Sequence, residues 1–149
     1  MPEHTSVSVV FRIKRDEGEQ VLTASGKLHR LNAGWAVTCR FLSEAEDSPG
    51  GDPEAGGPSE MLLVVTDGEI RMRRKGAVSQ EQHFRLGEWV PGTFGTPYGT
   101  LALEALTTRM RHGLSAAGGT VEWEYVLKAA DADLGRSWIQ MEVREEPLP

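Results

Sequence analysis

The chain has 149 residues, a length that fits one domain with a single substantial core. Its only cysteine, Cys39, excludes an intrachain disulfide, and its net charge of −6 argues against nucleic-acid binding, which depends on neutralising phosphates. No apolar stretch approaches the roughly 20 residues that span a bilayer, and the N-terminus shows no signal peptide. We therefore expect a cytoplasmic protein that does not bind membranes.

Most of the chain predicts short strands separated by turns. Asp67-Gly68, a typical hairpin turn, follows a run rich in β-branched residues at 61–65. Apolar and polar residues alternate with a period of two in five segments, namely 7–13, 35–41, 70–74, 121–128 and 139–144. Repeated strands of this kind predict an all-β fold, either an antiparallel sandwich or a barrel.

Residues 43–59 differ from the rest of the chain in composition. They contain four glycines, three prolines and no apolar residue larger than alanine. From 43 to 60 there are six acidic residues and no lysine or arginine. Such a stretch cannot bury enough surface to offset its ordering entropy. We expect a mobile acidic loop between two strands of one domain that spans residues 1–149.

The segment 100–114 leaves two structures open on its pattern alone. Leu103, Leu106, Met110 and Leu114 recur at helical spacing, and the residue types favour a helix. A strand in the same place would complete the all-β pattern on either side.

A family resemblance bears on this choice. The stretch from Asp67 to Glu145 resembles the YwiB-like family of bacterial calycin-type (lipocalin-like) β-barrels, whose domain has no known function. The resemblance implies a single antiparallel barrel of about eight to ten strands, with 99–114 as a long bent strand. It rests on the order of these residues: Arg74-Lys75-Gly76, Phe84, Thr96-Pro97-Tyr98-Gly99, Leu101, Leu103, Thr107, Gly119, Tyr125 and Leu127.

Arg74 is the first candidate for a binding residue. Alternation places it on the same face as Ile70 and Met72, which is expected to point inward. A buried arginine must be paired. Three interpretations stay open: an ion pair with Glu104, a position at the strand end where the side chain emerges, or bidentate binding of a ligand carboxylate.

The candidate ligand-binding set is Arg74, Met72, Tyr98, Trp123 and Tyr125. An inward apolar face with one cation and one phenol would suit a small anionic ligand with an apolar body. Tyr98 also fits a structural corner, because Pro97 and Gly99 on either side favour a tight bend. Arg71, Arg73 and Lys75 lie on the other face of the same strand, which fits a solvated outer surface. Together with Arg109 and Arg111 they also fit a patch that binds an anion or RNA, although the net charge argues against RNA.

Nothing in the sequence predicts catalysis. The four histidines are scattered without zinc-ligand spacing, and the motifs of nucleotide binding and of nucleophilic serines are absent from the sequence. Cys39 alternates onto an apolar face, where a cysteine is usually a small buried hydrophobe. We expect no cofactor, metal or enzymatic activity. The leading hypothesis is a non-catalytic small-molecule-binding barrel, and the alternative is a protein-interaction or structural module with a filled barrel.

Overall fold

The computed structural model describes residues 4–16, 18–41, 59–76, 79–130 and 132–146. Within these ranges the chain forms ten strands and no helix. The strands close into an antiparallel barrel in the order β1-β10-β9-β8-β7-β6-β5-β4-β3-β2. Their bounds are β1 His4–Arg15, β2 Gly18–Arg30, β3 Gly34–Phe41, β4 Ser59–Thr66, β5 Glu69–Lys75, β6 Ser79–Arg85, β7 Trp89–Thr96, β8 Gly99–Ser115, β9 Gly118–Ala129 and β10 Ala132–Glu145.

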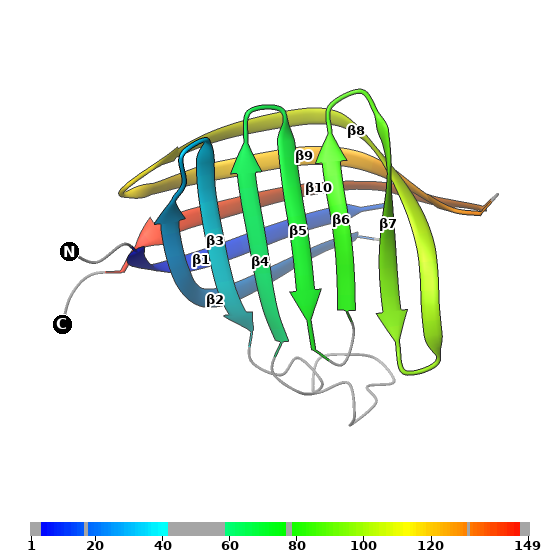
Figure 1. Ribbon diagram of the computed structural model, residues 1–149, viewed down its shortest axis with the longest axis horizontal. Helices are drawn as coiled ribbons and strands as arrows, with labels where there is room; N and C mark the ends of the chain where they lie inside the picture. Colours follow the sequence, from blue (N-terminus) through cyan, green and yellow to red (C-terminus); the bar gives the residue numbers. More distant parts are fainter. Residues whose placement is uncertain (1–3, 17, 42–58, 77–78, 131, 147–149) are drawn as a thin grey trace.

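The predicted all-β barrel is therefore confirmed, and its strands fall into two groups. The shorter strands β3 to β7 cross the long strands β1, β8, β9 and β10 at a steep angle (Figure 1). The two strands β2 and β8 join the groups, because each pairs with a long strand along one part and with a short strand along another. Apolar faces of both groups point inward.

One hydrophobic cluster fills the space between the two groups. Over most of β1, β5, β9 and β10, buried residues alternate with more exposed ones, as the sequence pattern predicts. Phe84 of β6 lies against two aromatic residues of β9, with ring centroids 5.6 Å from Trp123 and 4.6 Å from Tyr125. The largest fully buried side chains are Trp123, Phe84, Leu63, Ile70 and Met141. A core of this kind supplies the main stabilising free energy of the fold.

The segment 100–114 is part of β8, so the strand implied by the resemblance is confirmed and the helix is excluded. A β-bulge explains its misleading pattern. Thr107 pairs with Tyr125, but Arg109 pairs with Glu124, so one extra residue is inserted at position 108. The inward face passes from odd to even numbers at this point, and Met110 lies opposite the buried Trp123. Because of this change, Leu103, Met110 and Leu114 all lie on the inward face, whereas Leu106 lies on the outward face.

The bend of β2 depends on Gly26. This residue pairs with both Val7 of β1 and Cys39 of β3, where β2 passes from one group of strands to the other. A β carbon at Gly26 would overlap the carbonyl oxygen of Thr38 and lie 3.0 Å from its carbonyl carbon. Only glycine allows the two backbones to approach this closely.

Two further expectations concern the loops. Asp67-Gly68 forms the turn between β4 and β5, as predicted, with Gly68 at a φ of 77°. The predicted mobile segment 43–59 lies outside the described residues, apart from Ser59, where β4 begins. In the described part of the chain there is no helix that could cross a membrane.

Candidate anion-binding site

Arg74 occupies the inward face of β5, next to the last residue of the strand, Lys75. It follows Met72 on this face and pairs with Met61 of β4 and Gln80 of β6. Its Nε is buried and has no hydrogen-bond partner among the described residues. Burial lowers the pKa of the guanidinium below its ordinary value, because water stabilises the charge less well there. The barrel wall thus holds a partly desolvated cation with an unused donor.

The predicted ion pair between Arg74 and Glu104 is wrong, because the two side chains point to opposite sides of the barrel wall. Glu104 lies on β8 between the buried residues Leu103 and Ala105, so its side chain points outward while that of Arg74 points inward. The Glu104 carboxylate is instead 3.4 Å from Nζ of Lys128. No described carboxylate forms an ion pair with Arg74, so its charge is free to bind a ligand.

Arg74 is among the residues that line a depression of about 260 Å³ at one end of the barrel, which we call the Arg74 cavity. Most of the other lining residues, such as Lys75, Glu81 and Thr93, lie on outward positions of their strands, whereas Arg74 lies on an inward one. Three of its residues are cationic and one is acidic, and Arg73 is tied to the acidic residue, Glu81, at 3.0 Å. Lys75 forms no ion pair with the described part of the chain. Three hydroxyl groups complete the polar lining. The full set is Arg73, Arg74, Lys75, Ser79, Gln80, Glu81, Thr93, Gly95 and Thr100. The cavity is therefore positively charged and rich in hydrogen-bond donors.

Tyr98 lies in the turn between β7 and β8 and is 91% exposed. The flanking residues Thr96 and Gly99 pair with each other, and the backbone N–H of Tyr98 donates to Oγ1 of Thr96 at 3.1 Å. Thr100, two residues further along, lines the Arg74 cavity. Tyr98 is thus part of a structural corner near the cavity, and it does not itself line it.

The other predicted site residues lie in the packed core. Met72, Trp123 and Tyr125 are 7%, 1% and 5% exposed and belong to the hydrophobic cluster. Burial raises the pKa of the Tyr125 phenol, which shares a side-chain hydrogen bond with Ser137. None of the three lines the Arg74 cavity. The structure therefore brings Arg74 and Met72 onto one strand face, and Tyr98, Trp123 and Tyr125 lie outside the lining of the Arg74 cavity.

Sequence reasoning missed two buried polar residues. Gln82 of β6 and Thr107 of β8 are buried in the wall, and Gln82 Oε1 and Thr107 Oγ1 have no hydrogen-bond partner among the described residues. Gln82 Nε2 donates to the carbonyl oxygens of His83 and Val90 at 2.9 and 3.0 Å. The sequence signal was present, because Gln82 precedes the buried Phe84 by two positions and so shares its inward face.

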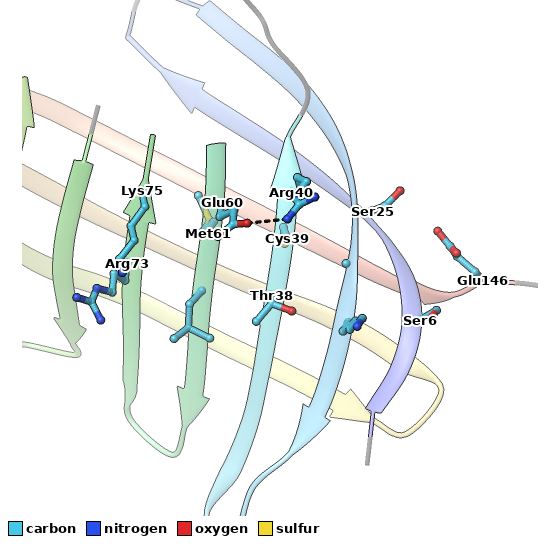
Figure 2. A pocket seen from close by; sticks show the side chains of 13 residues that line it. Ser6, Ser25, Thr38, Cys39, Arg40, Glu60, Met61, Arg73, Lys75 and Glu146 are labelled. Carbon is cyan, nitrogen blue, oxygen red and sulfur yellow. Dashed lines mark hydrogen bonds and ion pairs between the residues drawn. The ribbon is translucent and has the colours of Figure 1, made fainter. Parts of the chain in front are cut away.

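A second depression crosses the outer surface of β1 to β5, and we call it the outer groove (Figure 2). Its volume is about 640 Å³. Four cations and two carboxylates line it, and one ion pair, Arg40 with Glu60 at 2.8 Å, lies within it. Arg73 and Lys75 line both this groove and the Arg74 cavity. The lining residues are Ser6, Ser25, Gly26, Lys27, Thr38, Cys39, Arg40, Glu60, Met61, Leu62, Arg73, Lys75 and Glu146.

Cys39 and the histidines belong to no metal-binding group in the described part of the chain. Cys39 is buried, and desolvation raises the pKa of its thiol to about 12, so it stays protonated at neutral pH. The described residues include no group of three or more His, Cys, Asp or Glu side chains that could hold a metal ion. The expected absence of metal and cofactor stays a prediction.

Comparisons with known proteins place the chain without assigning an activity. A family model described as "Domain of unknown function (DUF1934)" matches residues 6–141. The crystal structure of ywiB protein from Bacillus subtilis is similar over 99% of this chain and 96% of that one, with a TM-score of 0.75 and 16% identity. At that identity the likeness shows a common fold alone. No curated protein matches the chain.

Proposed function

The chain belongs to the DUF1934 family, whose function is unknown, and we propose that it is a non-catalytic binding protein whose ligand is a small oxyanion held in the Arg74 cavity. One observation carries the proposal: the guanidinium of Arg74 is partly desolvated, it has no ion-pair partner in the described residues, and its Nε donor is unused. A carboxylate or phosphate would supply the missing charge and the missing acceptor together.

The cavity lining limits the chemistry of this ligand. A volume of about 260 Å³ lies below the roughly 300–1,000 Å³ that is usual for drug-sized ligands. The lining consists of charged, hydroxyl, amide and glycine residues. The apolar ligand body expected from the sequence finds no support here, because the aromatic residues that would have held it pack against each other in the core. We therefore propose a polar ligand such as inorganic phosphate or a short carboxylic acid.

A binding experiment with a matched control tests this proposal. Isothermal titration calorimetry is run with inorganic phosphate and with succinate on the wild type, Arg74→Met and Arg12→Met. Arg12 is an exposed arginine on β1 and lines neither depression. We expect saturable binding of at least one anion, a loss of about tenfold or more in Arg74→Met, and unchanged binding in Arg12→Met. Equal binding by all three proteins, or none by the wild type, overturns the proposal.

The second candidate function is a protein-interaction module with a filled barrel. It is favoured by the continuous hydrophobic cluster and by the size of the outer groove. The groove and the Arg74 cavity are neighbouring depressions that have Arg73 and Lys75 in common.

We also propose that the protein is a bacterial, cytoplasmic relative of the calycins. The fold shared with a Bacillus subtilis protein supports the bacterial source. The single cysteine, buried and reduced, suits a reducing compartment. A long bent strand such as β8, which joins two crossing groups of strands, is in keeping with a calycin-type barrel.

A further inference from the structure

We propose that the outer groove binds an acidic, extended segment of a partner protein. This inference deepens the protein-interaction candidate, on which it rests, and concerns a groove that shares only Arg73 and Lys75 with the Arg74 cavity. It rests on the placement of four cations on the outer face, on the length of the groove, and on the side chains between the cations.

The cations form two rows that the strand register fixes. In the first row Lys27, Thr38, Leu62 and Arg73 are successive partners on β2, β3, β4 and β5. Because neighbouring strands are about 4.8 Å apart, the Cα atoms at the two ends of this row are separated by roughly 14 Å. In the second row Arg40 and Lys75 flank Glu60 at two strand spacings, or roughly 10 Å. Figure 2 shows the second row and Arg73 spread over three strands.

The groove has a net positive charge, whereas the whole chain has a net negative charge. Four cations face Glu60 and Glu146, which leaves a surplus of two positive charges in a chain of net charge −6. Arg40 and Arg73 already have carboxylate partners, Glu60 and Glu81, in exposed ion pairs that water screens and that rearrange easily. Lys27 and Lys75 form no ion pair with a described residue. The unpaired ammonium groups therefore attract an anionic partner.

The remaining lining favours a polypeptide as that partner. The hydroxyl groups of Ser25 and Thr38 can bond to peptide groups, and Leu62 offers an aliphatic contact between the two ends of the first row. The described lining contains no aromatic ring on which a nucleobase could stack, and stacking supplies much of the affinity for single-stranded nucleic acid. An extended peptide rises about 3.3 Å per residue, so carboxylates at positions i and i+4 lie about 13 Å apart. This spacing matches the first row.

The proposal is tested by fluorescence anisotropy with three labelled probes. The first is a peptide with glutamates at i, i+2 and i+4, the second has glutamine at these positions, and the third is an oligouridylate of equal charge. We expect the full-length protein to bind the glutamate peptide and to bind it more weakly as salt rises, because exposed charges are screened. Failure to bind this peptide overturns the proposal, and so does equal or tighter binding of either other probe.

Two charge reversals locate the site. Lys27→Glu, in the groove, should weaken peptide binding by about tenfold, whereas Arg12→Glu on the same face of the neighbouring strand should change it less than about twofold. Both side chains are exposed, so both variants should melt like the wild type. Equal losses in the two variants would mean general attraction and would overturn the groove assignment. Arg74→Met should keep peptide binding, and Lys27→Glu should keep small-anion binding, which separates the two proposals.

Discussion

Gln82 occupies the space that a side chain at Gly92 would need. The two residues pair across β6 and β7, and a β carbon on Gly92 would overlap Oε1 of Gln82 and lie 2.5 Å from its Cδ. Gln82 cannot move away freely, because its Nε2 donates to the carbonyl oxygens of His83 and Val90. Glycine at 92 thus makes room for a buried amide in the barrel wall.

We therefore expect Gly92→Ala to destabilise the barrel by about 1–3 kcal/mol, the usual range for overpacking a core. Urea denaturation monitored by tryptophan fluorescence measures the change. Gly113→Ala is the control, since a β carbon there would have no neighbour within 4 Å. Equal stability of Gly92→Ala and the wild type would show that the Gln82 amide is not held in place.

Arg74→Met should leave the free protein at least as stable as the wild type, within about 1 kcal/mol. The substitution removes a partly desolvated charge and an unused donor, and it strands no described carboxylate. Thermal unfolding in a buffer without oxyanions measures the difference. A loss of several degrees would mean that Arg74 has a structural partner, which would weaken the case for a ligand.

Cys39 should make the folded protein less stable at high pH. The thiol has a pKa of about 12 in the folded chain and about 9 when unfolded, so only the unfolded state loses the proton between these values. Stability due to this group is complete below about pH 9 and falls by about 1.4 kcal/mol per pH unit above it. Cys39→Ala should show a shallower decline than the wild type in this window. Rapid alkylation of native Cys39 at about pH 8 would contradict the buried, protonated thiol.

Glu69 should make the folded protein less stable at low pH. Hydrogen bonds from Arg85 at 2.5 Å and Arg71 at 2.7 Å lower the pKa of its carboxyl group below the ordinary value of 4.5. The stabilisation is present above that ordinary value and is lost as the pH falls through the lowered pKa. Glu69→Gln should lower the melting temperature near neutral pH and flatten its decline below about pH 4.5. Glu122→Gln, on an outward position of β9, is the control, and an equal effect of both variants would contradict this role.

The sequence was sufficient for the stretches of strand in which the buried positions keep the same odd or even numbering, which in β10 begin after the irregularity between Asp133 and Gly135. In β1, β5, β9 and β10 the inward residues follow from alternation alone, because each strand buries one face. It was insufficient for β8, where the bulge at position 108 changes the parity and only the family resemblance indicated a strand. A bulge is defined by the pairing with the neighbouring strand. The sequence pattern of one strand therefore does not show where a bulge lies.

The candidate site was only partly predictable for a similar reason. Strand alternation placed Arg74 inward, and the same rule applied to β8 would have excluded Glu104 as its partner. The alternation of apolar and polar residues along a strand does not show how closely the opposite walls of a barrel approach each other. Trp123 and Tyr125 therefore looked like pocket residues, whereas Phe84 packs against both. The outer groove depends on strand register, which fixes which cations from different strands become neighbours.

The environment of the Arg74 side chain tests the proposed anion site most directly. Its Nε–H group gives a resonance in a ¹H–¹⁵N NMR spectrum, and it is identified by its loss in Arg74→Met. If an oxyanion binds this guanidinium, adding inorganic phosphate or succinate moves the resonance along a saturable curve with the dissociation constant found by calorimetry. A resonance that stays in place while the protein becomes saturated with either anion would contradict the account.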